Sequence, residues 1–425
     1  MKFAVIVDAY STGSQLPRHF AAQGWHSIHM KSTEKIAPFL LASYRPADFV
    51  EDLSFNGDFE ELLRQVRLVT AGLTPSCVMA GSEIGVEFSD RLAAAWQLPG
   101  NSPHTSRSRR DKYEMAMALQ RAGLAAPVSL RTNGEAELIK WAQQHDSWPI
   151  VLKPLASAGN DSVYFCHDMP EALSAFYAIL GTEDRLMAVN DHVLAQHLLK
   201  GTQYVVNSVS VDGRHYFSDI WIDRRTILPG ASNIYDYEEL LPSTGTIQAE
   251  LCAYVERALD ALGIRNGPAH SEVMLTANGP VLIETGARLQ GGVIERPILD
   301  TIGTSQISLS AERYCDEARF LSRFGQPYPI TSHLICVNLV SHTAGTVLDT
   351  TGFDAVKALA SYHCHSRLPS PGSTLKRTVD YFTIPGIVYL GNSDRAALHR
   401  DYEAIRRFER EGRLFRIAEH EAVDA

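Results

Sequence analysis

Two glutamates, Glu272 and Glu284, stand out because the segment that contains them, AHSEVMLTANGPVLIETGARLQGG (269–292), has the pattern of a β-hairpin. A three-residue loop at 277–279, with its glycine left-handed, would place Glu272 opposite Glu284 on the paired strands. Opposed carboxylates repel each other until one is protonated or a cation enters between them. Mg²⁺ is the usual cation where carboxylates and phosphates share a site. Two separately solvated glutamates on a sheet edge are the structural alternative.

The loop after the second glutamate carries positive charge and unhindered backbone amides. Arg288 lies four residues after Glu284, and Gly291 and Gly292 follow within the same loop. A cation beside exposed N–H groups is suited to a developing oxyanion. A turn with a surface arginine would have the same sequence.

Two lysines upstream have the surroundings of a phosphate site. Lys153 ends the strand-like segment VLK and precedes the small-residue loop ASAGNDS at 156–162, whose backbone N–H groups could close over a polyphosphate. Lys112 opens a predicted helix 41 positions earlier in the chain, after several arginines. Taken alone, each lysine has the pattern of a solvated surface residue.

The segment VLAQHLLKGTQYVV (193–206) places apolar residues before a glycine turn and a strand. Such a hinge would offer backbone groups to a purine ring, although a core strand has the same pattern.

The order of these pieces resembles the ATP-grasp superfamily of carboxylate–amine ligases over residues 105–325. Its elements are Lys112, the KP and small-residue loop at 153–162, the QHLLKGTQY segment at 196–204, Glu272, and Glu284 with Arg288. The hairpin text is most similar to bacterial L-amino-acid ligases that make dipeptides, in which GAR replaces the more common NPR.

The resemblance implies how ATP would be held. Lys112 and Lys153 would contact the α- and β-phosphates, and the loop 157–162 would close over the triphosphate. The remaining nucleotide contacts implied are Ser157, Gly159 and Ser162 in that loop, Gln196 and the Leu198 backbone at adenine, and Gln203 where relatives commonly have a ribose-binding glutamate.

The resemblance also implies a metal and an oxyanion site. Glu272 and Glu284 would bind two Mg²⁺, with Mn²⁺ as the alternative ion, while Arg288, Gly291 and Gly292 would stabilise the acyl phosphate and the tetrahedral species. Three further positions are noted: Gly286 stands where many relatives have a metal-binding Asn, Arg224 or Arg225 would reach the γ-phosphate, and His270 is either a substrate contact or a packed core histidine.

The implied activity is ATP-dependent joining of one L-amino acid's carboxylate to another's amine through an acyl phosphate, with release of ADP and phosphate. Another ATP-grasp carboxylate–amine or carboxylation ligase, and a nucleotide-binding regulator without catalysis, are the alternatives. The retention of both glutamates and Arg288 argues against the regulator. The sequence does not identify the two amino acids or the base that deprotonates the amine.

The elements that would position these residues mix α/β and α+β patterns. Residues 3–7 (FAVIV) read as a buried parallel strand, but the following STGSQ lacks the second and third glycines of a dinucleotide-binding loop. The expected fold is ATP-grasp with a Rossmann-like N-terminal domain and a β-rich C-terminal subdomain. The expected parts are a pre-ATP-grasp domain at 1–105, the N-terminal and lid subdomain at 106–195, the metal-binding subdomain at 196–325, and a C-terminal subdomain at 326–425.

The composition fits an enzyme that acts on small molecules. With 39 Lys and Arg against 49 Asp and Glu, the formal charge of −10 argues against a nucleic-acid partner. Six scattered cysteines without a CxxC pair predict reduced thiols and a cytoplasmic location. No stretch is long and apolar enough to span a bilayer, so no membrane partner is expected. A homodimer remains open.

Overall fold

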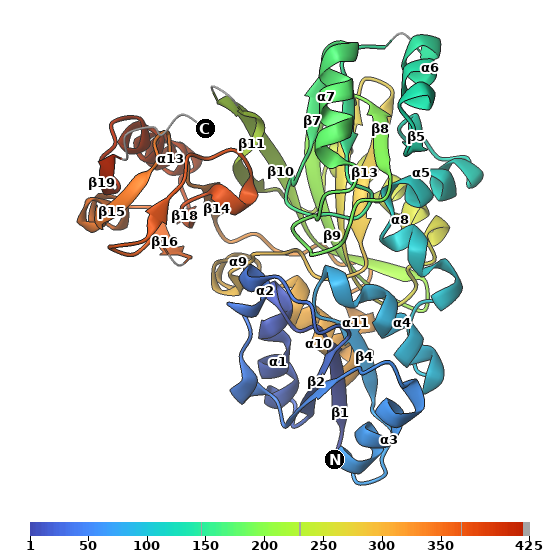
Figure 1. The fold of residues 1–425 in the computed structure, drawn as a ribbon. Helices are drawn as coiled ribbons and strands as arrows, with labels where there is room; N and C mark the ends of the chain where they lie inside the picture. Colours follow the sequence, from blue (N-terminus) through green and yellow to red (C-terminus); the bar gives the residue numbers. More distant parts are fainter. Residues whose placement is uncertain (146, 229–230, 367, 420–425) are drawn as a thin grey trace. The chain divides into compact units, whose positions relative to one another are not determined.

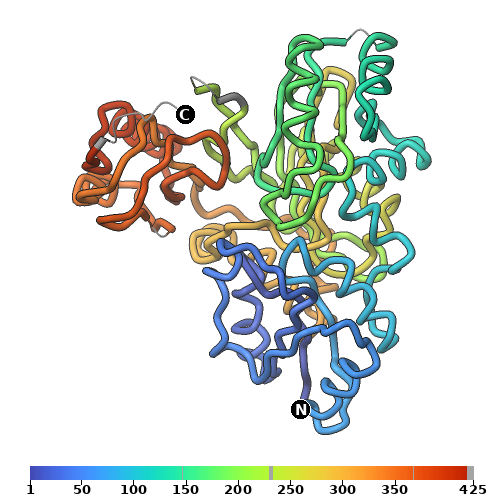
Figure 2. Tube along the Cα trace, viewed as in Figure 1, coloured from blue at the N-terminus to red at the C-terminus, as the bar shows by residue number. Residues whose placement is uncertain are grey.

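The computed structural model describes residues 1–145, 147–228, 231–366 and 368–419. The chain divides into two compact units, and the first contains residues 1–220, 244–293 and 304–327. The second contains residues 221–243, 294–303 and 328–425. The chain therefore passes between the units several times, as the colours of Figure 2 allow the reader to follow.

The chain begins with a four-stranded parallel sheet in the order β3-β2-β1-β4. Every residue of β1 is buried, because its apolar run lies between two neighbouring strands. The strands are β1 (Phe3–Val7), β2 (His26–Lys31), β3 (Glu51–Ser54) and β4 (Cys77–Ala80), and the α-helices are α1 (Leu16–Ala22), α2 (Pro38–Leu41), α3 (Phe59–Val69) and α4 (Val86–Ala95). This arrangement confirms the expected Rossmann-like domain (Figure 1).

A second sheet of the first unit has antiparallel strands in the order β5-β8-β6-β7. The strands are β5 (Ser129–Thr132), β6 (Ile150–Lys153), β7 (Tyr164–Cys166) and β8 (Val193–His197), and the helices are α5 (Lys112–Arg121), α6 (Glu135–His145) and α7 (Met169–Ile179). Side chains of α6 and α7, among them Trp141 and Phe176, form one apolar core with the strands. This core supports the end of β6, where Lys153 lies.

The third part of the first unit carries the hairpin. Its strands follow the order β13-β12-β9-β10, and β10 runs on into the second unit. The elements are β9 (Thr202–Val211), β10 (Arg214–Leu228), β12 (Gly267–Thr276), β13 (Gly279–Gly286), α8 (Thr246–Ala261), α10 (Gln306–Cys315) and α11 (Glu317–Ser322).

The hairpin brings Glu272 and Glu284 opposite each other, as predicted, but by a different route. Thr276 pairs with Gly279, so the loop has two residues rather than three. A β-bulge next to Glu272 adds the missing residue to the other strand and restores the predicted pairing. Gly279 has φ +101°, a conformation that glycine adopts readily. The predicted loop length was therefore wrong, although the predicted carboxylate pair was right.

The second unit is built largely from strands. One of its sheets contains β11 (Ala231–Leu240), β14 (His333–Asn338), β18 (Ile387–Asn392) and β16 (Tyr362–His365), and a small sheet contains β17 (Thr374–Leu375), β15 (Gly345–Asp349) and β19 (Arg416–Glu419). The helices are α9 (Glu295–Ile302), α12 (Asp354–Lys357) and α13 (Arg395–Arg410). Asp394 caps α13, whose apolar side packs in one core with β14 and β18.

The described residues show all six cysteines as free thiols, four of them on strands of the sheets. In the same part of the chain, every helix is too short or too polar to cross a bilayer.

Candidate active site

Lys112 connects the hairpin with the small-residue loop. It is the first residue of α5, where Asp111 caps the helix by accepting the N–H groups of Tyr113 and Glu114. Its Nζ lies 2.7 Å from Glu284 Oε2 and donates to the carbonyl of Ser157 at 2.9 Å. Two sequence segments predicted to hold phosphate and metal therefore meet at one ammonium group.

Lys153, at the end of β6, is buried with 7% of its surface exposed. Burial, and to a lesser degree the nearby Lys112, lowers the pKa of its ammonium to about 8, although Glu284 and Glu272 partly offset both effects. A buried cation is costly without a partner. An incoming phosphate would therefore be stabilised at this position.

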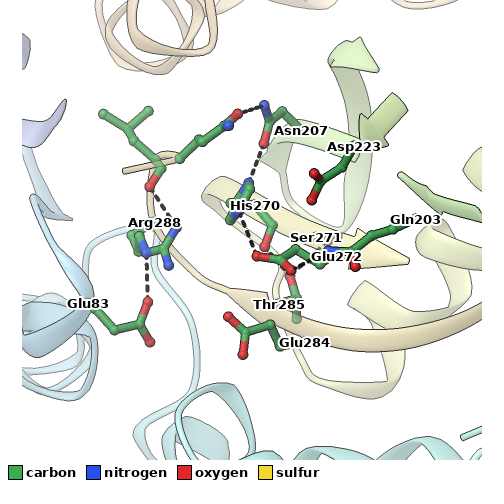
Figure 3. A network of polar contacts seen from close by, with 12 residues as sticks. Glu83, Gln203, Asn207, Asp223, His270, Ser271, Glu272, Glu284, Thr285 and Arg288 are labelled. Carbon is green, nitrogen blue, oxygen red and sulfur yellow. Dashed lines mark hydrogen bonds and ion pairs between the residues drawn. The ribbon is translucent and has the colours of Figure 1, made fainter. Parts of the chain in front are cut away.

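Each carboxylate oxygen of Glu272 has a polar neighbour. Gln203 Nε2 donates to its Oε2 at 2.8 Å, and His270 Nε2 lies 3.7 Å from its Oε1. Figure 3 shows Glu272 between these two side chains, with Glu284 on the neighbouring strand. Gln203, which the sequence suggested for ribose, contacts the carboxylate proposed as a metal ligand, and its contact with ribose stays a prediction.

Arg288 forms an ion pair that the sequence did not indicate. Its Nε donates to Glu83 Oε2 at 2.6 Å, as Figure 3 shows. Arg110 donates to the other oxygen of Glu83. Burial would raise the pKa of Glu83, but Arg288, Arg110 and Lys112 lower it to about 2. A Cβ on Gly286 would lie 2.8 Å from Glu83 Oε2, so a side chain there would displace the pair. Glycine at 286 thus leaves room for the Arg288–Glu83 contact.

The Rossmann-like N-terminal domain, called the first domain below, also binds the end of the Arg288 loop. The N–H of Gly292 donates to Ser11 Oγ at 3.0 Å, and that of Val293 donates to Thr12 Oγ1 at 3.0 Å. Both hydroxyls belong to the short 3₁₀ helix Ser11–Gln15 after β1. Because the Gly292 amide is engaged in this arrangement, its use as an oxyanion donor would require the bond to Ser11 to open.

Several of these side chains, among them Lys112, Glu284 and Arg288, line one small cavity within the first unit. Its walls combine cations, a metal-type carboxylate and the small-residue loop. The lining residues are Glu83, Arg110, Lys112, Met115, Ser157, Ala158, Glu284, Thr285, Gly286 and Arg288. Glu83, Arg110 and Met115 were not selected from the sequence, because nothing in their local pattern distinguishes them from structural residues.

The other predicted nucleotide contacts named here do not line this cavity. Gln196 is buried on β8 next to Val151 of β6 and donates to Ser129 Oγ at 2.9 Å. Leu198 follows that strand, partly exposed. Gly159 and Ser162 both have positive φ, 67° and 52°, in the loop that begins with Ser157.

The two arginines proposed for the γ-phosphate belong to the second unit. Arg225 is bound to Asp223, with Nη2 2.6 Å from Oδ2, and its guanidinium lies 3.4 Å from the centre of the Tyr235 ring. Arg224 is exposed. Neither arrangement decides which arginine would meet a phosphate, so that prediction stays open.

Comparisons with known proteins agree with this geometry. The model of the ATP-grasp domain matches residues 109–292, which include both lysines, both glutamates and Arg288. Dapdiamide A synthase of Enterobacter agglomerans is 33% identical over 409 residues, covering 95% of this chain and 94% of that protein. The chain belongs to the ATP-grasp ligases.

More distant relatives extend the comparison. The L-arginine-specific L-amino acid ligase of Bacillus subtilis is 23% identical over 222 residues, 52% of this chain and 53% of that protein. The crystal structure of the L-amino acid ligase of Bacillus licheniformis has a TM-score of 0.75 at 19% identity and covers 99% of both chains. The ATP-grasp fold and the enzyme class predicted from the sequence, an ATP-dependent carbon–nitrogen ligase, are thereby confirmed.

The ATP-grasp site has a donor set that suits Mg²⁺ only with phosphate present. Among the described residues, no group of three or more His, Cys, Asp or Glu side chains gathers as a metal site. Glu272 and Glu284 supply hard oxygen donors from neighbouring strands. Mg²⁺ commonly takes one or two carboxylates and fills its octahedron with phosphate oxygens and water. The residues present therefore fit Mg²⁺ that arrives with ATP.

Proposed function

We propose that this protein joins the carboxylate of one L-amino acid to the amine of another, converting ATP to ADP and phosphate. The observation that carries the proposal is the cavity in which Lys112, Glu284 and Arg288 meet. The names of the relatives, an L-amino acid ligase and dapdiamide A synthase, support amino acids as the substrate class.

A carboxylate needs activation before an amine can attack it, because its oxygen is a poor leaving group. In the proposed reaction, the carboxylate oxygen of the first amino acid attacks the γ-phosphorus of ATP, and ADP leaves. Lys153 and Lys112 would offset the charge of the phosphates, and their burial supports a strong interaction. The amine of the second amino acid then attacks the acyl carbon, and phosphate leaves.

Glu272 and Glu284 would hold Mg²⁺ against the β- and γ-phosphates, and a second ion is included in the proposal. When bound, Mg²⁺ supplies charge neutralisation at the oxygens of the transferred group. Metal bound at Glu284 Oε2 would compete with the 2.7 Å contact of Lys112. The freed ammonium would then be available to the phosphates, so metal and nucleotide should bind together.

Arg288 would stabilise the negative charge that gathers on the acyl oxygen. Its guanidinium is fixed by Glu83 through Nε, which restricts its orientation before substrate arrives. Preorganised donors of this kind cost no reorganisation during the reaction. The first domain would thus contribute to catalysis through Glu83 without supplying a reacting group.

The alternatives differ from this proposal in observable ways. Another ATP-grasp ligase would release phosphate with a different carboxylate or amine, and a regulator would bind Mg-ATP without turnover. Gly286 replaces the metal-binding Asn of many relatives, so Glu272 and Glu284 remain as the proposed metal carboxylates. Arg288 is held in its ion pair with Glu83, which supports a working ligase. The homodimer remains a proposal that sedimentation would test.

The experiment is a screen of amino-acid pairs for phosphate release from ATP, with products identified by mass spectrometry. Glu284→Gln serves as the inactive control, because it keeps size and removes the charge that a metal needs. We expect phosphate release only with particular pairs and a matching dipeptide mass. Phosphate release that follows a different carboxylate or amine, with no amino-acid pair active, would overturn the proposal.

A further inference from the structure

A buried polar network runs behind the proposed metal site. Asn207, on β9, is 2% exposed and is the cross-strand neighbour of His270 on β12. Its Nδ2 donates to Asp219 Oδ1 at 2.6 Å and to Gln290 Oε1 at 2.7 Å. Its Oδ1 contacts His270 Nδ1 at 2.9 Å, as Figure 3 shows. One amide therefore joins three other side chains.

Two branches of this network lead to residues of the proposed mechanism. Through His270, whose Nε2 lies 3.7 Å from Glu272 Oε1, Asn207 reaches a proposed metal ligand. Through Gln290, it reaches the loop that carries Arg288 two residues earlier. The backbone N–H of Gln290 is also fixed, because it donates to Gln306 Oε1 at 3.0 Å.

Hydrogen-bonding requirements fix the direction of each bond. The carboxylate of Asp219 accepts, so the Asn207 amide nitrogen must face it and the Asn207 oxygen must face His270. His270 therefore donates from Nδ1 to the Asn207 oxygen, and its other ring nitrogen, Nε2, lies 3.7 Å from Glu272 Oε1. Outer partners of this kind orient metal ligands, and their loss typically costs about 10–100-fold in metal affinity or activity.

We propose that Asn207 is a positioning residue that sets the metal ligand Glu272 and the Arg288 loop in one arrangement. The inference rests on the proposed function, since it takes Glu272 as a metal ligand and Arg288 as the oxyanion donor. A buried amide that merely stabilises the fold would affect the melting temperature and leave catalysis and metal binding unchanged.

The branches can be separated by single substitutions. His270→Leu removes the contact behind Glu272 and should weaken binding of Mg-ADP, measured by calorimetry. Gln290→Met keeps the length of the side chain but removes its acceptor, so it should lower kcat and leave the affinity for Mg-ADP unchanged. Ser210→Ala is the matched control, because Ser210 is buried on the same strand and its hydroxyl contacts His215 at 2.7 Å, outside this network.

Asn207 itself is tested by an exchange of donor and acceptor. Asn207→Leu should lower kcat and Mg-ADP affinity by about 10–100-fold. Asn207→Asp alone places two carboxylates together and should be equally harmful. Combined with Asp219→Asn, the amide and the carboxylate change places, so the pair is restored with reversed polarity. An aspartate at 207 cannot donate to Gln290, so we expect the combination to recover the affinity for Mg-ADP through His270 and to recover kcat only in part.

Melting temperatures of all variants decide between positioning and simple structural support. If Asn207→Leu does not fold, the single substitutions at His270 and Gln290 and the exchanged pair still give the answer. Folded variants with wild-type kcat and wild-type Mg-ADP affinity would overturn the proposal. If the wild-type protein ligates no amino acids, the proposed function fails instead, and the Mg-ADP measurements still test the network.

Discussion

Replacing Glu83 by glutamine tests whether the first domain holds Arg288 in place. The pKa of Glu83 lies near 2 instead of 4.5. At about 1.4 kcal/mol per pKa unit, this difference means that the ionised carboxylate is stabilised by about 3 kcal/mol relative to a neutral one. Because glutamine resembles the neutral form, Glu83→Gln should lose about 3 kcal/mol, which corresponds to a fall of roughly 5 °C in melting temperature.

The pH dependence has a definite sign. A carboxylate whose pKa is lowered by folding stabilises the protein fully above about pH 4.5, its ordinary pKa, and loses this contribution as the pH falls toward about 2. The difference in melting temperature between wild type and Glu83→Gln should therefore be constant near neutral pH and shrink below about pH 4.5. Scanning calorimetry between these pH values measures it.

The kinetic consequence acts through Arg288. A guanidinium that loses its 2.6 Å contact can shift, and a misplacement of about 1 Å can cost about 10²-fold in rate. Glu83→Gln should therefore lower kcat with little change in the KM for ATP, and it should add little further loss in an Arg288→Ala background. Glu87→Gln, at an exposed position of α4, is the matched control. Full kcat and an unchanged melting temperature in Glu83→Gln would refute the reasoning.

Substitutions at three further positions address the cations and the metal ligand. Lys153→Met should raise stability near neutral pH by about 3 kcal/mol, since folding lowers this lysine's pKa from 10.5 to about 8, and the gain should disappear as the pH approaches 10.5. The same variant should bind ATP poorly, as calorimetry would show, and unchanged ATP affinity would exclude a phosphate contact. Glu284→Gln should abolish turnover and make nucleotide binding insensitive to Mg²⁺; near-normal turnover at saturating Mg²⁺ would remove it from the site. Arg288→Ala should lower kcat by about 10²–10³-fold, and Arg288→Lys should recover only part of it because lysine lacks the planar fork; a change confined to the KM for ATP would contradict this.

The sequence contained the parts of the site that depend on neighbouring residues. The pairing of Glu272 with Glu284 follows from a hairpin, because both strands and their turn lie within one continuous segment. Its exact loop could not be predicted, since a two-residue loop plus a bulge produces the same pairing as a three-residue loop. The order of Lys112, Lys153 and the hairpin indicated the family, which supplied the rest of the expected fold.

Contacts between distant segments were outside the reach of local patterns. Glu83 lies 205 positions before Arg288, and only the folded chain brings the two together. The same is true of Ser11, whose hydroxyl accepts a hydrogen bond from the N–H of Gly292, 281 positions further along the chain. The local sequence left a surface arginine open as the alternative for Arg288, whereas its side chain is 12% exposed and paired. Removing it should also lower stability, an effect that its local sequence gave no reason to expect.

The central claim, activation of an amino-acid carboxylate by the γ-phosphate of ATP, is tested most directly with an isotope. The amino acid that supplies the carboxylate is labelled with ¹⁸O at both carboxylate oxygens and ligated to an unlabelled partner. The released phosphate is then analysed by mass spectrometry. Since the carboxylate oxygen attacks phosphorus and leaves with it, each phosphate should carry one ¹⁸O and the dipeptide should retain the other. Unlabelled phosphate, or label in the nucleotide product, would contradict the acyl phosphate and with it the mechanism proposed for this site.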